Sequence, residues 1–177
     1  MSGVRESGCS IDVAEEQDAL VADVEWSLPG GVAALYVMCT DAGGAVSSAS
    51  DVVFRKTPRL TGDGVVLRHE STPEGRTKAQ VQVCFELLDP NVGRLEFVLS
   101  AGRSSVLTGL QDLTVAMWNP RDGASVETWT LPSPKLAKRV ELGRLERRES
   151  GWTVTMNPVP NEFDFNQLFQ ERYEAPS

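Results

Sequence analysis

The sequence predicts an all-β protein, a two-sheet β-sandwich of nine to ten strands followed by one short C-terminal helix. Short apolar runs with a period near two recur along the chain, and turn residues separate them at regular intervals. A helical period appears only near the C-terminus. With 177 residues, 41% of them hydrophobic, the chain can bury one sizeable core, so we expect a single domain over residues 20–177.

The clearest strand signal lies at residues 78–88, where Val81, Val83, Phe85 and Leu87 fall on one face. Further strands are expected at residues 21–28, 33–40, 51–56, 65–71, 94–100, 113–118, 125–131, 138–147 and 151–159. The turn residues Asn-Pro-Arg-Asp-Gly at 119–123 predict a hairpin between two of these strands.

The C-terminal segment 161–173 predicts a helix with Asn161 as its N-cap. Three apolar residues recur on one side at helical spacing: Phe165, Leu168 and Phe169. Such a stripe must be covered. Two explanations remain open, because the helix would either close the open end of the sandwich or dock a protein partner.

Residues 1–19 are polar and show no sustained period, which predicts a disordered N-terminal arm. The arm lacks the apolar stretch of a signal peptide, and no later segment is apolar for long enough to span a membrane. The three cysteines form no C-x-x-C pair and leave an odd thiol in any disulfide scheme, which favours a reducing compartment. We therefore expect a cytoplasmic protein.

The net charge of -8 gives a field that repels phosphate backbones, so no nucleic-acid partner is expected. The residues for common kinds of catalysis are also missing. His69 is the one histidine, no G-x-S-x-G elbow presents a serine, and no phosphate-binding loop occurs. His69 stands among alternating strand residues, where a solvated side chain is the expected role. We expect a protein that is not an enzyme.

The acidic segment 60–75 raises the question of a metal site. Three scattered cysteines and one histidine cannot supply a zinc site, but calcium binds carboxylate oxygens. The candidate ligands are Asp63, Glu70 and Glu74, which Asp41 and Asp51 would join from neighbouring loops. Three basic residues lie among them: Arg68, Arg76 and Lys78. Because these charges oppose a divalent cation, a solvated loop is favoured over a calcium site, and no cofactor is expected.

Four tryptophans lie in or beside predicted strands. Trp26 and Trp152 alternate with core residues and are expected inside. Trp118 and Trp129 are expected to share the opposite face, where exposure would make them a partner surface and coverage would make them ordinary packing.

Three segments, taken in this order, resemble the tellurium-resistance TerD family: residues 21–54, 79–102 and 138–159. The last is similar to a closing hairpin with the pattern G-E-L-Y-R followed by G-E-W. Its matching residues here are Gly143, Leu145, Arg147, Gly151 and Trp152.

The resemblance implies a bacterial, cytoplasmic β-sandwich linked to stress or chemical damage, and hence a non-enzymatic interaction or scaffold module. Calcium-binding members carry acidic runs where this chain has Gly31–Ala33 and Glu74–Lys78. Because both segments have lost carboxylates, calcium binding is not carried over. A weak calcium module using residues 60–75 is the alternative function.

Overall fold

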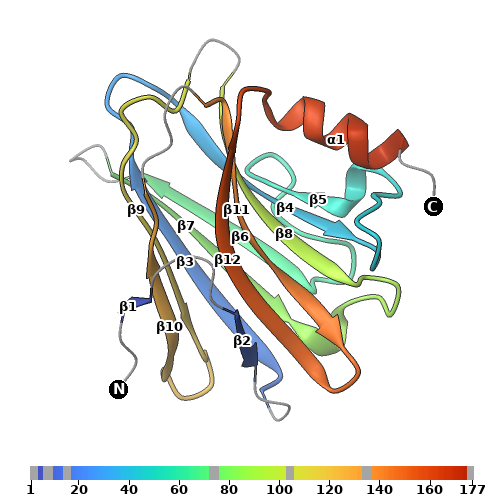
Figure 1. Cartoon of the computed structure of the whole chain (residues 1–177). Coiled ribbons are helices and arrows are strands. Elements are labelled where there is room, and N and C mark those ends of the chain that lie inside the picture. The colour runs from blue at the N-terminus through green and yellow to red at the C-terminus, as the bar shows by residue number, and fades with distance from the viewer. Residues whose placement is uncertain are drawn as a thin grey trace.

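The computed structural model describes residues 4–5, 10–13, 17–71, 76–102, 106–132 and 137–174 of the chain. Two six-stranded sheets pack face to face (Figure 1). Sheet A has the order β1 (Val4–Arg5), β10 (Ser125–Thr130), β9 (Gln111–Trp118), β3 (Ala19–Ser27), β7 (Arg76–Cys84) and β6 (Val65–Ser71). Sheet B has the order β2 (Ser10–Val13), β12 (Gly151–Asn161), β11 (Arg139–Arg148), β8 (Arg94–Ala101), β4 (Ala33–Thr40) and β5 (Val52–Val53). Neighbouring strands are antiparallel, except that β1 runs parallel to β10.

The predicted fold class is confirmed. Strands β4 and β6 match their predicted ranges, and the predicted hairpin turn joins β9 to β10. In that turn the Asn119 N–H donates to the Ala124 carbonyl at 2.8 Å, and Gly123 adopts a φ of +75° that favours glycine. The described residues form twelve strands instead of the expected nine or ten, because two short strands form within residues 1–19.

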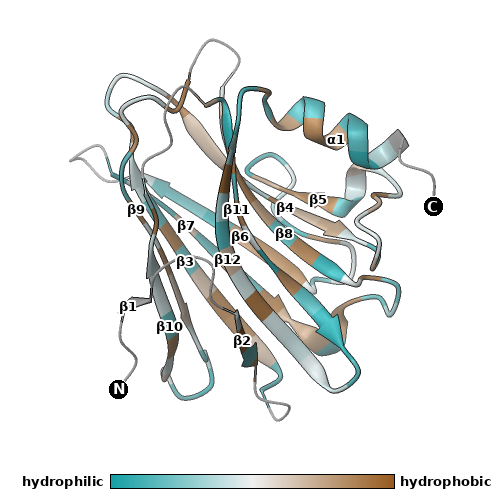
Figure 2. Ribbon diagram, viewed as in Figure 1, coloured by the Kyte–Doolittle hydropathy of each residue, from teal (hydrophilic) through white to brown (hydrophobic). Residues whose placement is uncertain are grey.

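One core fills the space between the two sheets, where the inward residues of each strand meet. Figure 2 shows the hydrophobic residues of these strands as brown bands along the ribbons. Trp26 and Trp152 belong to this core, as predicted. Trp129 belongs to it as well, with 0% exposure, so its predicted role on a partner surface is wrong. A bulge between Ser125 and Glu127 breaks the alternation of β10 and sets Trp129 opposite the buried Val115.

The strand expected over residues 78–88 ends early. β7 stops at Cys84, and Phe85–Leu87 form a short 3₁₀ helix in which Leu87 is 51% exposed. The Phe85 N–H donates to the Asp18 carbonyl at 3.0 Å, which ties this turn to the start of β3. The Phe85 ring stacks on Trp152 with 5.3 Å between the ring centres. Of the predicted apolar face, Val81 and Val83 lie in the strand, whereas Phe85 and Leu87 do not.

A second, smaller core lies on the outer face of sheet B, where the helix α1 (Phe165–Glu174) covers β4 and β8. Its buried members are Met38, Val46, Val52, Val98, Phe165 and Leu168. The helix therefore covers one face of a sheet and not the open end of the sandwich. The Asp164 Oδ1 accepts the Gln167 N–H at 3.2 Å and acts as the N-cap, whereas the predicted cap, Asn161, is the last residue of β12.

The closing hairpin of β11 and β12 is held by the residues that carry the family resemblance. Gly143 sits in a bulge where an added Cβ would collide with the Thr155 carbonyl and lie 2.8 Å from the Met156 Cα. The Arg147 guanidinium lies 4.7 Å from the centre of the Trp152 ring, and its Nε donates to the Val92 carbonyl at 2.9 Å. These motif positions serve the fold.

The N-terminal arm differs from its prediction. Ser10–Val13 pair with β12 as an antiparallel strand, with Val13 opposite Trp152 and only 5% exposed, while Val4–Arg5 pair with β10. Without these strands, β12 and β10 would be sheet edges with free backbone groups, so backbone pairing orders a segment that has no hydrophobic period.

Truncation of residues 1–13 is therefore expected to destabilise the protein by about 1–3 kcal/mol, because the deletion removes the β2 ladder and uncovers apolar surface at Trp152. Urea denaturation of the truncated and intact chains measures the loss. Deletion of residues 1–3 alone is the control and should change little. Equal stability of the intact chain and the longer truncation would show that β2 contributes nothing.

Candidate functional site

The structure does not bring the predicted calcium ligands together. Asp63 lies in the turn before β6 and pairs with Arg59 at 3.2 Å, whereas Glu70 lies near the far end of β6 opposite Lys78. Glu70 lies five residues along β6 from its first residue, Val65, which places it about 17 Å from the turn that holds Asp63 at roughly 3.3 Å per residue. Glu74 lies outside the described residues. The prediction that Asp63 and Glu70 converge on one calcium ion is therefore wrong, because an extended strand holds the two carboxylates apart.

Three other aspartates do line one cavity of about 200 Å³, namely Asp41, Asp51 and Asp89. Each accepts backbone N–H groups of its own turn: Gly43 and Ala45 for Asp41, Ser47 and Ser48 for Asp51, and Asn91 for Asp89. These bonds fix loop conformation. Within the described ranges, no three Asp, Glu, His or Cys side chains lie close enough to hold a metal ion.

The aromatic residues predicted to bind a partner are occupied within the fold. Phe165 and Leu168 lie on the side of α1 that faces sheet B and are buried there, and Phe169 is half-buried beside them. Trp118 is half-buried as well, and its Nε1–H donates to Asp23 Oδ2 at 2.9 Å. The stripe on the helix therefore covers sheet B.

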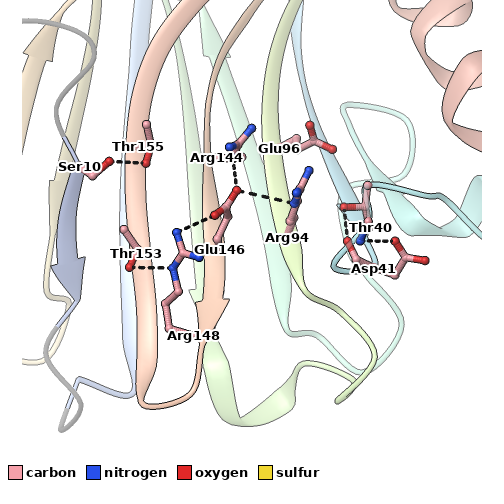
Figure 3. A network of polar contacts seen from close by, with 12 residues as sticks. Ser10, Thr40, Asp41, Arg94, Glu96, Arg144, Glu146, Arg148, Thr153 and Thr155 are labelled. Carbon is pink, nitrogen blue, oxygen red and sulfur yellow. Dashed lines mark hydrogen bonds and ion pairs between the residues drawn. The ribbon is translucent and has the colours of Figure 1, made fainter.

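The part of sheet B that α1 leaves open carries charged side chains (Figure 3). Glu146 on β11 is 13% exposed and pairs with three arginines. Arg148 Nη2 lies 2.8 Å from Glu146 Oε2, Arg94 Nε lies 3.6 Å from Glu146 Oε1, and Arg144 is in direct contact with the same oxygen. We call Arg94, Arg144 and Arg148 the arginine cluster. Together with Glu146 it carries a net charge of +2 on a chain of -8.

The outward ends of these arginines reach solvent, since the side chains of Arg144 and Arg148 are 45% and 57% exposed. Polar groups flank the cluster on β12 and β2. Thr153 Oγ1 donates to Asp12 Oδ1 at 3.0 Å, and the Ser10 and Thr155 hydroxyls lie 2.7 Å apart. The surface is therefore polar, and its net charge is +1 when the flanking Asp12 is counted with Glu146 and the three arginines.

Sequence reasoning missed the arginine cluster for a physical reason. The alternation of β11 does place residues 144, 146 and 148 on one face. Arg94, however, is far from them in sequence, and only the pairing of β8 with β11 sets it opposite Glu146. The sequence did contain one indication of the cluster, the Arg-x-Glu-x-Arg spacing at residues 144–148 within one predicted strand.

His69 occupies a different environment from the predicted solvated one. It lies on the inner face of β6, half-buried, with its ring centre 5.9 Å from that of Trp26. Desolvation by burial, followed by the nearby Arg55 cation, lowers the pKa of His69 below 6.5. Its Nε2 atom is buried and has no hydrogen-bond partner among the described residues.

Comparison with known proteins rests on structure, because no family model and no curated protein matches the sequence. A homologue of the telluride resistance protein TerD, SCO6318 from Streptomyces coelicolor A3(2), superposes with a TM-score of 0.67. The match covers 90% of this chain and 99% of that chain at 12% identity. This chain has a TerD-like fold. SAV2460, a protein of unknown function, matches with a TM-score of 0.66 over 86% of this chain and 94% of that one, at 14% identity.

The TerD-like fold confirms the resemblance as far as architecture is concerned. The two segments where the resemblance implied lost calcium ligands meet in space, because Gly31, Ala33 and Thr77 line one cavity of about 220 Å³. The described residues that line it include no carboxylate.

His69 is expected to titrate with a pKa below 6.5, because burial penalises the imidazolium. The unfolded chain then binds a proton that the folded chain does not, so the free energy of unfolding should fall as the pH drops from about 7 through the folded pKa. NMR of this single histidine measures the pKa directly. Arg55→Gln should raise the value while leaving it below 6.5, since desolvation is the larger cause. A folded-state pKa at or above 6.5 would contradict this assignment.

Proposed function

We propose that the chain is a non-enzymatic interaction or scaffold module that docks an acidic segment of a partner protein on the arginine cluster. The observation that carries the proposal is the excess of positive charge around Glu146 on an exposed sheet face of an acidic protein. Arginine forks suit carboxylates, and opposite charge steers association. A partner with an acidic strand or loop fits this face.

The chemistry of the candidate nucleophiles supports the non-enzymatic part of the proposal. Burial raises the pKa of the Cys39 thiol to about 12, so the reactive thiolate is absent near neutral pH. Within the described part of the chain, no hydroxyl or thiol is hydrogen-bonded to the imidazole of His69 to be activated by it. Cys39 is therefore not activated as a nucleophile, and His69 does not act as the base for one.

The cellular setting is proposed from likeness alone. A structural neighbour is described as a homologue of a telluride resistance protein, and on that basis we place this chain in a bacterial stress-response or defence system, acting in the cytoplasm without a nucleic-acid partner. No helix among the described residues is both long enough and apolar enough to cross a bilayer.

The proposal is tested with fluorescein-labelled deca-glutamate as a model acidic segment, and binding is measured by fluorescence anisotropy at an ionic strength of about 100 mM, where the Debye length is about 10 Å. The Arg144→Gln/Arg148→Gln variant should bind at least about tenfold more weakly, because it removes two of the charges that face the peptide. Its melting temperature should fall, because Glu146 is only 13% exposed and keeps only Arg94 of its three arginine partners. Far-UV circular dichroism at the binding temperature checks that the variant is folded.

The matched control is Arg68→Gln/Arg121→Gln, which removes the same charge from exposed positions outside sheet B. This control should bind within about twofold of the parent chain, because the lost charges lie farther from the peptide than a Debye length of about 10 Å. Equal weakening by both double variants would mean that only net charge matters. No measurable binding by the parent chain would remove the proposed role of the arginine cluster.

We also propose that the module works without a resident metal. A calcium titration of the chelator-stripped protein should leave its melting temperature unchanged up to about 5 mM, since an ion that binds only the folded state must raise stability. A saturable rise would instead support the alternative function, a weak calcium module. The triple variant Asp63→Ala/Glu70→Ala/Glu74→Ala would then show whether the predicted calcium ligands supply the site.

A further inference from the structure

The cavity of about 220 Å³ lies at one end of the sandwich, where the two sheets part. Sheet A contributes Trp26, Leu28, His69, Ser71 and Thr77. The opposite wall comes from the turn Gly31–Ala33 and from Arg55. The cavity thus combines an apolar wall with hydrogen-bonding groups, as small-molecule sites do.

Strand register explains why the polar groups converge. Ser71 on β6 pairs with Thr77 on β7, which in turn pairs with Trp26 on β3, so the three side chains form one row on the inner face of sheet A. His69 pairs with Ala79 in the next row toward the core. Two hydroxyls and an imidazole therefore sit together at the mouth of an otherwise apolar core.

Two features of this cavity are unsatisfied within the protein. The Nε2 atom of His69 is buried and finds no hydrogen-bond partner in the described part of the chain, a costly state for a polar atom. Arg55 sits in a tight turn closed by hydrogen bonds of 3.0 and 3.1 Å between Phe54 and Thr57, and no described carboxylate pairs with it. Beside them, Val32 is an apolar side chain left 65% exposed at the rim.

We propose that this cavity binds a small organic carboxylate with a compact apolar body. The carboxylate accepts hydrogen bonds from Arg55, from the hydroxyls of Ser71 and Thr77 and from the imidazole of His69. The apolar body lies against Trp26, Leu28 and Val32. Such a ligand gives the buried nitrogen a partner, neutralises a guanidinium that pairs with no described carboxylate, and covers the exposed valine. A cation does not suit the site, because the described lining offers a positive charge and no carboxylate.

Benzoate is a suitable probe, and the single histidine supplies a clean readout. Titration of the full chain with benzoate should shift the His69 ring signals in ¹H–¹⁵N NMR, with half-saturation at low-millimolar concentration, as fits a ligand of about nine heavy atoms. Arg55→Gln should weaken binding at least about fivefold, because it removes the guanidinium that the described lining offers to a carboxylate. Arg55 is exposed, so the variant should keep its fold.

Arg59→Gln is the matched control, since Arg59 is an exposed arginine four residues away that pairs with Asp63 and does not line the cavity. It should leave the benzoate affinity within about twofold of the parent, because its charge is already paired and solvent-screened.

Benzamide, which has the same shape without the charge, and inorganic phosphate, which lacks the apolar body, should both bind more weakly than benzoate. Three outcomes would overturn the proposal: no shift of His69 with benzoate up to about 20 mM, equal effects of the two arginine variants, or binding of benzamide or phosphate as tight as that of benzoate.

Discussion

The bidentate ion pair between Arg172 and Glu96 fixes the C-terminal helix α1 to sheet B. Arg172 Nη2 and Nη1 donate to the two Glu96 oxygens at 2.9 and 3.0 Å, and Nη1 also donates to the Gly44 carbonyl at 3.0 Å. Burial raises the pKa of Glu96, and Arg172 opposes that shift by favouring the carboxylate. A guanidinium that donates two hydrogen bonds to a nearly buried carboxylate is held in one orientation. The ion pair therefore determines where α1 lies on sheet B more than it stabilises the fold.

The position of the helix divides the outer face of sheet B into two parts. Under α1 the face is apolar, and Val98 and Met38 are fully buried there. Beyond α1, β8 and the neighbouring β11 carry Arg94 and Arg144, whose side chains are 26% and 45% exposed. A covered apolar half and an open polar half follow from one docking contact, and this division is why the account places partner binding on the arginine cluster and not on the helix.

The sequence pattern of neighbouring residues predicted the features that depend only on those neighbours. The alternation in β4 and β6, the hairpin turn before Gly123 and the burial of Trp26 could all be inferred from neighbouring residues. Features set by pairing at long range could not. The bulge that turns Trp129 inward, the capture of residues 10–13 by β12 and the meeting of Arg94 with Glu146 depend on which strands lie side by side. The cavity at His69 has the same origin, because it joins segments from both sheets.

The central claim is that the open half of sheet B, with α1 firmly docked, is the binding face. The most direct measurement is a map of backbone ¹H–¹⁵N chemical-shift changes during titration with deca-glutamate. The account predicts that the shifts are confined to residues around Arg94, Arg144 and Arg148, while Phe169 and Tyr173 of α1 stay unchanged. Shifts concentrated on α1, or loss of its signals on binding, would contradict it by showing that the helix leaves sheet B to bind the partner itself.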